Sequence, residues 1–387
     1  MFENLVENIQ GYKKPLAFGI ARVDLGQLNH DKVLQATYPV VNWNENFGSA
    51  AVFVRALFET GVEIDFNESE FVAPIGKDFV DTALELFGEE LVAEAVGEKH
   101  KNIQVLKVLK EMFEEDDYDN YRICFLFEDA APKSVEAVYL KLYALSTRKV
   151  PLRSINLNGA FGILHNCAWV GNVPIELDYL RANEIEMKIK DSFPEIEYVD
   201  KFPRFLSHII PDDNIRILDT AKVRFGAQLA QGTTVMPGAS YINFNAGTEG
   251  PVMVEGRISS SAVVKEGADV GGGASILGVL SGTNGNPITI GRNTLLGANS
   301  VTGIPLGDGC IVDAGIAVLE GTKIWISEDE FNKIKEVNPE WKAEYKEYFK
   351  GLELAGLNGV HYRFDTTKGK MVAFRSRREV KLNEELH

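Results

Sequence analysis

The second half of the sequence offers carboxylates rather than histidines for chemistry. All six histidines lie outside residues 209–360, so a histidine base or a three-histidine metal site is excluded from that region. A group that accepts a proton there must therefore be a carboxylate. The acidic residues considered for this role are Asp219, Glu249, Glu255, Glu266, Asp269, Asp308, Asp313 and Glu320.

Glu255 differs from the other carboxylates in what precedes it. It follows the segment Tyr241–Gly250, which departs from the repeat described below, and a loop at that point would expose its side chain. A carboxylate beside a bound thioester can act as a nucleophile or as a general base. The alternative interpretation is an outward-facing carboxylate that pairs with Arg257 and does no chemistry.

An apolar residue recurs at every sixth position between about residues 215 and 325. Neither an α-helix nor an ordinary strand has this period, whereas a three-sided parallel β-helix does, with one hexad on each face. Glycine or asparagine punctuates most hexads, as corners with positive φ require. Short strands of a β-sandwich are the alternative. The expected inward residues are Ile217, Val223, Leu229, Val235, Val252, Ile258, Val264, Val270, Ile276, Ile290, Leu296, Leu306, Val312, Val318 and Ile324.

Residues 1–205 lack the six-residue period and predict a separate α/β domain. Strand-like runs are expected at Leu16–Val23, Tyr121–Phe127 and Leu152–Trp169. Helical periodicity appears in Ala50–Thr60, Asp78–Val96, Ile103–Glu115, Val135–Ser146 and Ile175–Phe193.

Residues 327–387 predict a small cap on the prism of residues 206–326. A capping box at Ser327–Glu330 opens a helical stretch that is expected to extend towards Lys350, with an interruption at Pro339. A β-hairpin is expected further on, with strands Val360–Phe364 and Met371–Arg375.

Composition limits the classes of protein that need to be considered. With 387 residues, 45% hydrophobic and 25% charged, the chain predicts two or three globular domains without a membrane span. The formal charge of −16 opposes contact with nucleic acid or anionic lipid. The acidic N-terminus lacks a secretory signal, so we expect a cytoplasmic location. Three separated cysteines predict buried thiols rather than disulfides.

Several strings in and around the repeat resemble the long-chain subgroup of tetrahydrodipicolinate N-succinyltransferases. They are Asn243–Gly247, Met253–Arg257, Asp269–Ser275, Leu280–Gly282 and Leu295–Ser300, with further likeness at Val199–Arg204 and Leu382–Leu386. The resemblance implies a left-handed β-helix and transfer of a succinyl group from succinyl-CoA to tetrahydrodipicolinate, in lysine and diaminopimelate biosynthesis. It also implies a homotrimer with its site in the groove between the coils of neighbouring subunits, and no tightly bound cofactor.

The resemblance assigns roles to individual residues. Glu255 takes the place of the catalytic glutamate, acting through an acyl-anhydride or by assisting direct attack of the amine. Gly278 corresponds to an oxyanion donor, although a simple corner glycine is the alternative. The implied succinyl-CoA contacts are Arg257, Gly272, Ser275, Ala298, Asp313, Ala314, Gly321, Lys350, Arg363, Phe364, Asp365 and Thr366.

Some members of that family hold Mg²⁺ on the trimer axis with acidic side chains. This sequence has Pro237–Ser240 and Ala221 at the corresponding places, so no metal is expected. An acetyl-CoA-dependent N-acetyltransferase is the nearest alternative activity, and Arg257 argues against it because a succinyl tail supplies a carboxylate to bind. A noncatalytic solenoid scaffold is the alternative from another class.

Overall fold

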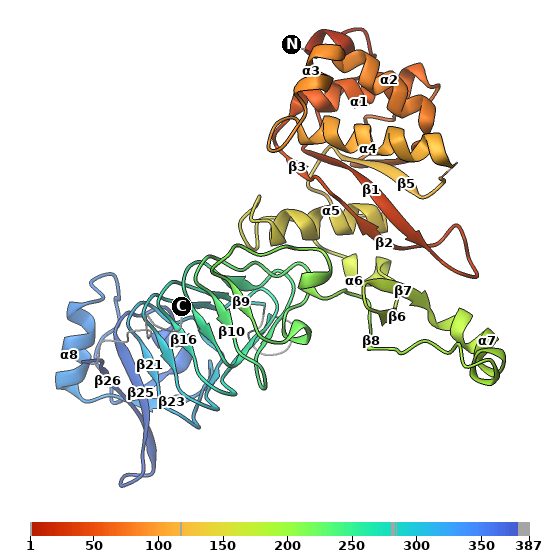
Figure 1. Cartoon of the computed structure of the whole chain (residues 1–387). Helices are drawn as coiled ribbons and strands as arrows, with labels where there is room; N and C mark the ends of the chain where they lie inside the picture. The colour runs from red at the N-terminus through yellow and green to blue at the C-terminus, as the bar shows by residue number, and fades with distance from the viewer. Residues whose placement is uncertain (1, 117, 280–282, 284, 378–387) are drawn as a thin grey trace. The chain divides into compact units, whose positions relative to one another are not determined.

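The computed structural model describes residues 2–116, 118–279, 283 and 285–377. The chain divides into two compact units, drawn in Figure 1. The first comprises Met1–Ala144 and Ser154–Pro203, and the second comprises Leu145–Arg153 and Arg204–His387. Two strings of the family resemblance, Leu280–Gly282 and Leu382–Leu386, lie outside the described residues.

The first unit is built on an antiparallel sheet with strand order β2-β1-β5-β4, and β3 also pairs with β1. Its strands are β1 (Ala17–Leu25), β2 (Val33–Thr37), β3 (Asn42–Trp43), β4 (Glu70–Pro74) and β5 (Tyr121–Leu126). Its helices are α1 (Phe47–Glu59), α2 (Lys77–Phe87), α3 (Glu89–Glu94), α4 (Lys101–Glu115) and α5 (Val135–Ser146), the last of which ends in the second unit. Sheet and helices meet where the buried ring of Phe18 packs edge-on against Phe53 and stacks on Phe125.

A smaller sheet of the same unit has the order β7-β6-β8. It contains β6 (Cys167–Val170), β7 (Val173–Glu176) and β8 (Tyr198–Asp200), with the helices α6 (Ala160–Ile163) and α7 (Leu177–Ile189). Trp169 is fully buried in this sheet, where its indole N–H donates to the Asp200 carbonyl oxygen at 2.9 Å. This bond anchors the sheet, because a buried indole N–H needs an acceptor.

Two sequence expectations for this unit are corrected. The helical stretch Asp78–Val96 is two helices, because Gly88 adopts a φ of 83° and ends α2. The strand-like run Leu152–Trp169 contains a strand only from Cys167, since turns and α6 occupy the residues before it. Among the described residues, none of the helices combines the length and apolar character needed to cross a bilayer.

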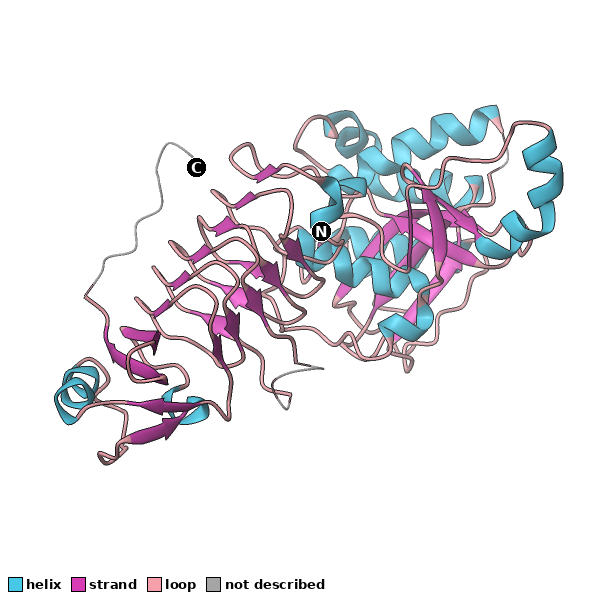
Figure 2. Ribbon diagram, turned by 90° about the horizontal axis from the view of Figure 1, so that it is seen from below, coloured by secondary structure: helices cyan, strands magenta, loops and turns pink. Residues whose placement is uncertain are grey.

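The second unit winds through three ladders of two-residue parallel strands, which Figure 2 shows stacked along the solenoid. The first ladder runs β9-β10-β13-β16-β19-β21, the second β11-β14-β17-β20-β22 and the third β12-β15-β18. From β10 to β20, successive strands along the chain fall in successive ladders, which fits a parallel β-helix. The strands are β9 (Arg216–Ile217), β10 (Thr234–Val235), β11 (Tyr241–Ile242), β12 (Gly247–Thr248), β13 (Met253–Val254), β14 (Arg257–Ile258), β15 (Val263–Val264), β16 (Asp269–Val270), β17 (Ser275–Ile276), β18 (Thr289–Ile290), β19 (Leu295–Leu296), β20 (Val301–Thr302), β21 (Ile311–Val312) and β22 (Ala317–Val318).

The expected inward residues are buried, apart from Ile217 in the first strand, which is partly exposed. Each buried aliphatic side chain stabilises the fold by about 1.5–3 kcal/mol. The register differs from the expected one in two places. The segment Tyr241–Gly250 was expected to leave the repeat as a loop, but it contains the ladder strands β11 and β12. Further on, Val254 rather than Val252 pairs with Val235 and Val270. Thr302 occupies a buried ladder position between Ile276 and Val318 that the aliphatic pattern did not mark.

The C-terminal elements extend the first ladder in the order β21-β25-β26-β23-β24. They are β23 (Lys323–Trp325), α8 (Glu328–Glu336), β24 (Tyr348–Lys350), β25 (Val360–Asp365) and β26 (Lys370–Arg375), and β25 and β26 form an antiparallel hairpin. The helix that was expected to approach Lys350 ends at Glu336 instead. Asn338 follows it, and its side-chain amide donates to the carbonyl oxygens of Ile334 and Asn358.

Candidate active site

At five levels of the first ladder, the residues that follow the paired strand positions lie at the same corner of the solenoid. Val254 pairs with Val270, Val270 with Leu296, Leu296 with Val312, and Val312 with Tyr362. Adjacent strands lie about 4.8 Å apart, so four steps extend over about 19 Å. We call the residues that follow these paired positions the corner column. Its members are Glu255, Gly271–Gly272, Gly297–Ala298, Asp313–Ala314 and Arg363–Phe364.

Glu255 lies in a shortened corner at one end of this column. Only three residues separate Val254 from Ile258, whereas five separate Val270 from Ile276 in the next coil. The shortened corner runs so close to the next coil that a Cβ on Gly256 would collide with the Ala274 carbonyl oxygen. Position 256 therefore requires glycine.

The Glu255 backbone is fixed while its carboxylate is left available. Its N–H donates to the Val270 carbonyl oxygen at 2.8 Å, and its own carbonyl oxygen accepts from the Gly273 N–H at 3.2 Å. The partly buried side chain points over Gly272, where an added Cβ would lie 3.6 Å from Oε2. Within the described part of the chain, no hydrogen bond or ion pair engages this carboxylate. Its oxygens are thus free to attack or to accept a proton.

Arg257 projects from the next strand and is not paired with Glu255. Its Nη2 donates to the Ser275 hydroxyl at 3.0 Å, across the register between β14 and β17. The guanidinium is exposed, and none of the described carboxylates forms an ion pair with it. The alternative of a Glu255–Arg257 surface pair is therefore not what the structure has. An exposed guanidinium with one hydroxyl partner can bind the carboxylate of a ligand.

Asp313 forms the most connected polar group of the column. Its Oδ1 lies 2.7 Å from Nε2 of His361, and its Oδ2 accepts from Nε of Arg363 at 2.5 Å. Burial alone would raise the pKa of the Asp313 carboxyl, but the hydrogen bonds from Arg363 and His361 outweigh burial and lower it. Asp313 is therefore a carboxylate that both neighbours hold in place.

A groove of about 710 Å³ lies beside this group, between the hairpin, β23 and α8. It takes in four residues that the sequence predicted for the cofactor, namely Arg363, Phe364, Asp365 and Thr366. Its charged lining includes Glu330 and three cations, Arg363, Lys368 and Arg377. Nearby, Nζ of Lys370 lies 3.8 Å from the centre of the Trp325 ring, which also lines the groove. Cations and exposed aromatic rings together suit a phosphorylated nucleotide.

Three sequence-predicted residues belong neither to the corner column, nor to the Arg257–Ser275 pair, nor to the groove lining. Gly278 follows β17 at the next corner, where an added Cβ would lie 3.1 Å from Cβ of Ser259. Gly321 and Lys350 lie close to each other, because Lys350 pairs with Lys323 and the Gly351 N–H donates to the Thr322 carbonyl oxygen at 2.9 Å. Within one chain, none of Gly278, Gly321 and Lys350 lies beside Glu255.

His361 is the polar residue of this region that the sequence reasoning missed. The alternation His361-Tyr362-Arg363 places His361 and Arg363 on one face of β25, while the buried Tyr362 points to the other. Asp313, the residue that joins them, is 48 positions from His361. The strand period could have shown that His361 and Arg363 share a face, but not that Asp313 lies between them.

The described residues offer neither a metal site nor a reactive thiol. Across the described ranges, no three His, Cys, Asp or Glu side chains gather as a metal site would require. The cysteines Cys124, Cys167 and Cys310 are free and buried, as the sequence predicted. Burial raises the pKa of the Cys167 and Cys310 thiols to about 11, so both are protonated at neutral pH.

Three family models match the chain. Residues 1–162 match the N-terminal part of tetrahydrodipicolinate N-succinyltransferase, residues 164–204 match its middle part, and residues 287–320 match the hexapeptide repeat of succinyl-transferase. The matches cover both compact units, so the likeness is not confined to the repeat.

Curated relatives match along the whole length. A 2,3,4,5-tetrahydropyridine-2,6-dicarboxylate N-succinyltransferase of Nitratiruptor is 69% identical over 100% of this chain and 98% of its own. The protein of that name from Campylobacter jejuni is 59% identical over 99% of this chain and 96% of its own. A crystal structure of a Campylobacter jejuni protein described as a 2,3,4,5-tetrahydropyridine-2-carboxylate N-succinyltransferase superimposes with a TM-score of 0.92, at 58% identity, covering 98% of this chain and 97% of that one.

Proposed function

The chain belongs to the tetrahydrodipicolinate N-succinyltransferase family, and on that premise we propose how its solenoid carries out the transfer. The protein is an acyltransferase of lysine and diaminopimelate biosynthesis. It moves the succinyl group of succinyl-CoA to tetrahydrodipicolinate and gives N-succinyl-2-amino-6-oxopimelate and CoA. Water adds to the C=N bond of the ring and makes its nitrogen an amine. This nitrogen forms an amide with the succinyl carbonyl carbon as the thioester C–S bond breaks, and the ring opens to the 6-oxo chain.

Glu255 is the proposed catalytic residue. The observation that supports this role is its partly buried carboxylate, which has a fixed backbone and no partner among the described residues. As a general base it would take the proton of the attacking amine, and as a nucleophile it would form an acyl-anhydride that the amine then opens. Both routes end with the proton on the CoA sulfur.

The corner column is the proposed path of the cofactor. Gly272, Ala298 and Ala314 give it small side chains, so an extended pantetheine arm can lie close to the coils. The arm would run from Glu255 towards Asp313 and the hairpin groove, over the distance of about 19 Å that the ladder spacing gives. The phosphates and the nucleotide would then meet Arg363, Phe364, Asp365 and Thr366, which line the groove. The remaining proposed contacts are Ser275, Gly321 and Lys350.

Arg257 is proposed to bind the free carboxylate of the succinyl group. Its exposed guanidinium has Ser275 as its hydrogen-bond partner and can form a bidentate pair. Thiol release from succinyl-CoA and from acetyl-CoA, each with tetrahydrodipicolinate, tests the assignment. We expect a strong preference for succinyl-CoA that falls in Arg257→Ala. Equal turnover of the two donors by the unaltered protein would favour an acetyltransferase instead.

A shared site between neighbouring copies would account for Gly278. We propose a left-handed, three-sided prism over residues 206–326 that assembles as a homotrimer, preceded by an α/β domain and closed by the C-terminal cap. Gly278 lies at a different corner from Glu255, so a groove between two prisms would bring Gly278 of one copy to Glu255 of the next. Its backbone N–H would there stabilise the oxyanion of the tetrahedral intermediate. Sedimentation during turnover tests this, because a fully active monomer would contradict a shared site.

A cytoplasmic location is proposed as well. The proposed acyl donor is a CoA thioester, and an enzyme in the cytoplasm would have direct access to the CoA of the cell. The acidic net charge of −16 argues against nucleic acid or anionic membrane as a partner, since like charges repel. Cell fractionation with an antibody against the native protein would check the location.

A further inference from the structure

The outward face of the hairpin end of the first ladder carries one connected group of three side chains. His361 and Arg363 lie two positions apart on β25, and Asp313 follows the neighbouring strand β21. Both carboxylate oxygens of Asp313 are engaged, Oδ1 with His361 at 2.7 Å and Oδ2 with Arg363 at 2.5 Å. The Asp313 N–H also donates to the Tyr362 carbonyl oxygen at 3.0 Å, so its backbone is fixed against the same strand.

Phe374 on β26 packs against the His361 ring and the Arg363 guanidinium. Its ring centre lies 4.5 Å from that of His361 and 5.5 Å from the Arg363 guanidinium carbon. His361 is paired with Phe374 in the hairpin register, so the two rings face the same side of the sheet. The imidazole is largely covered, with only 11% of its side chain exposed. The position of Asp313 between the His361 imidazole and the Arg363 guanidinium is therefore defined by packing as well as by hydrogen bonds.

Arg363 uses only part of its hydrogen-bonding capacity in this arrangement. Its Nε holds Asp313, while half of its side chain remains exposed beside the groove. Among the described residues, no acceptor engages Nη1 or Nη2. A guanidinium held through Nε presents its two terminal nitrogens as a planar fork, which matches the oxygens of a phosphate. Asp313, whose two oxygens are occupied, would repel a phosphate rather than bind it.

We infer that Asp313 and His361 are positioning residues that hold the Arg363 guanidinium towards a phosphate group of the acyl-CoA donor. The inference rests on the proposed function, and it gives Asp313 a different role from that of a direct cofactor contact. The phosphate is met by Arg363, and Asp313 acts through Arg363. His361 acts one step further away, because its ring holds the other oxygen of the same carboxylate.

The test compares two acyl donors that differ in the phosphates. Succinyl-CoA has them, whereas succinyl-pantetheine keeps the thioester and the arm but has none. We expect Asp313→Ala and Arg363→Ala each to raise the KM for succinyl-CoA about tenfold, with kcat within about twofold of the unaltered protein. With succinyl-pantetheine, both variants should match the unaltered protein. His361→Phe keeps a ring against Phe374 and should raise the KM for succinyl-CoA about threefold.

Non-additivity is the second readout. If Asp313 acts only through Arg363, the double variant should be no worse than Arg363→Ala alone. Asp308→Ala is the matched control, because Asp308 is a coil carboxylate that accepts from the Arg292 N–H and lies outside the groove lining. Asp313→Asn serves as the milder variant should Asp313→Ala not fold, which its circular dichroism would show.

Two results would overturn the inference while the enzyme itself remains active. One is an equal rise in KM with both donors, which would mean that Asp313, His361 and Arg363 do not act on a phosphate. The other is a double variant whose rise in KM is the product of the two single rises, which would mean that Asp313 acts independently of Arg363. An unaltered protein that turns over neither donor would instead refute the proposed function, and this inference with it.

Discussion

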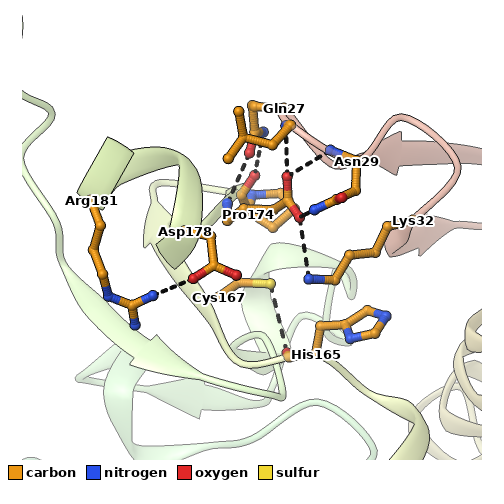
Figure 3. Close-up of polar contacts among 10 residues, drawn as sticks. Gln27, Asn29, Lys32, His165, Cys167, Pro174, Asp178 and Arg181 are labelled. Carbon is orange, nitrogen blue, oxygen red and sulfur yellow. Dashed lines mark hydrogen bonds and ion pairs between the residues drawn. The ribbon is translucent and has the colours of Figure 1, made fainter. Parts of the chain in front are cut away.

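Removing the negative charge of Glu176 should destabilise the first unit in a way that depends on pH. This residue ends β7, and its side chain is only 1% exposed. Figure 3 shows Gln27, Asn29 and Lys32 from the loop after β1 beside Pro174 of β7. The Glu176 oxygens accept from the Leu28 and Asn29 N–H groups at 2.8 and 3.3 Å, from the Asn29 side-chain amide at 2.8 Å and from Lys32 Nζ at 3.2 Å.

The size of the effect follows from the pKa of this carboxyl. Burial alone would raise the pKa of Glu176, but the hydrogen bonds from Asn29, Leu28 and Lys32 lower it from 4.5 to about 2. At about 1.4 kcal/mol per pKa unit, the ionised form contributes about 3 kcal/mol to the free energy of unfolding. Because the pKa is lowered on folding, this contribution is complete above pH 4.5 and is lost as the pH falls towards 2.

The perturbation is Glu176→Gln, with Asp178→Asn as the matched control. Asp178 lies two residues away and pairs with Arg181 in an ion pair that is about two-thirds exposed on both sides. Hydrogen exchange of the peptides around residues 26–32 and 173–176, read by mass spectrometry in increasing urea, gives the stability of this unit rather than of the solenoid.

We expect Glu176→Gln to lower the free energy of unfolding by about 3 kcal/mol at pH 7, and by less than half of that at pH 3. Asp178→Asn should leave it unchanged, since exposed pairs contribute little. The reasoning is refuted if the Glu176→Gln deficit is the same at pH 7 and pH 3, or if the control costs as much.

Three further outcomes follow from the structure. Val264→Asp places a charge in the solenoid interior and should lower the stability in thermal unfolding by more than about 3 kcal/mol, whereas Lys265→Asp should not. Equal melting temperatures of the two variants would contradict the inward assignment of Val264. Gly256→Ala should lower turnover by displacing the corner that carries Glu255, and wild-type kinetics would show that the close approach to Ala274 is unimportant. The three buried cysteines should resist a disulfide reagent in the native protein and react in urea, so rapid native labelling would contradict their burial.

The repeat could be predicted from the sequence because its period belongs to one architecture. Aliphatic residues at Ile258, Val264, Val270 and Ile276 occupy buried ladder positions as expected. Val252 is buried as expected but does not take the ladder position, since the corner at Glu255 is shortened and Val254 continues the ladder. A change in corner length shifts the register without changing the apolar composition, so periodicity alone could not locate it.

The candidate site was predictable only where it depends on residues close together in the sequence. Glu255 and Arg257 belong to one short string, so they lie close together whatever the register of the repeat. The bonds of Asp313 to His361 and Arg363 join β21 to a strand that begins 48 residues later, after a helix and β24. No local pattern sets that register. It comes from the way β25 docks on the last level of the first ladder.

The helical expectation for the residues after the repeat failed for a different physical reason. The residues after Pro339 are rich in lysine and glutamate, which favour a helix. In the folded chain, however, Asn338 bonds to both α8 and the loop before β25, and Tyr348–Lys350 pair with β23. Tertiary hydrogen bonds thus override a weak local preference.

The catalytic role of Glu255 is the central claim, and the most direct test measures turnover and cofactor binding on the same Glu255→Gln protein. The change removes the negative charge and leaves the shape of the side chain. The account predicts that thiol release from succinyl-CoA with tetrahydrodipicolinate falls by at least about a hundredfold, while calorimetry gives an unchanged Kd for CoA. Turnover close to that of the unaltered protein, with CoA still bound, would contradict it.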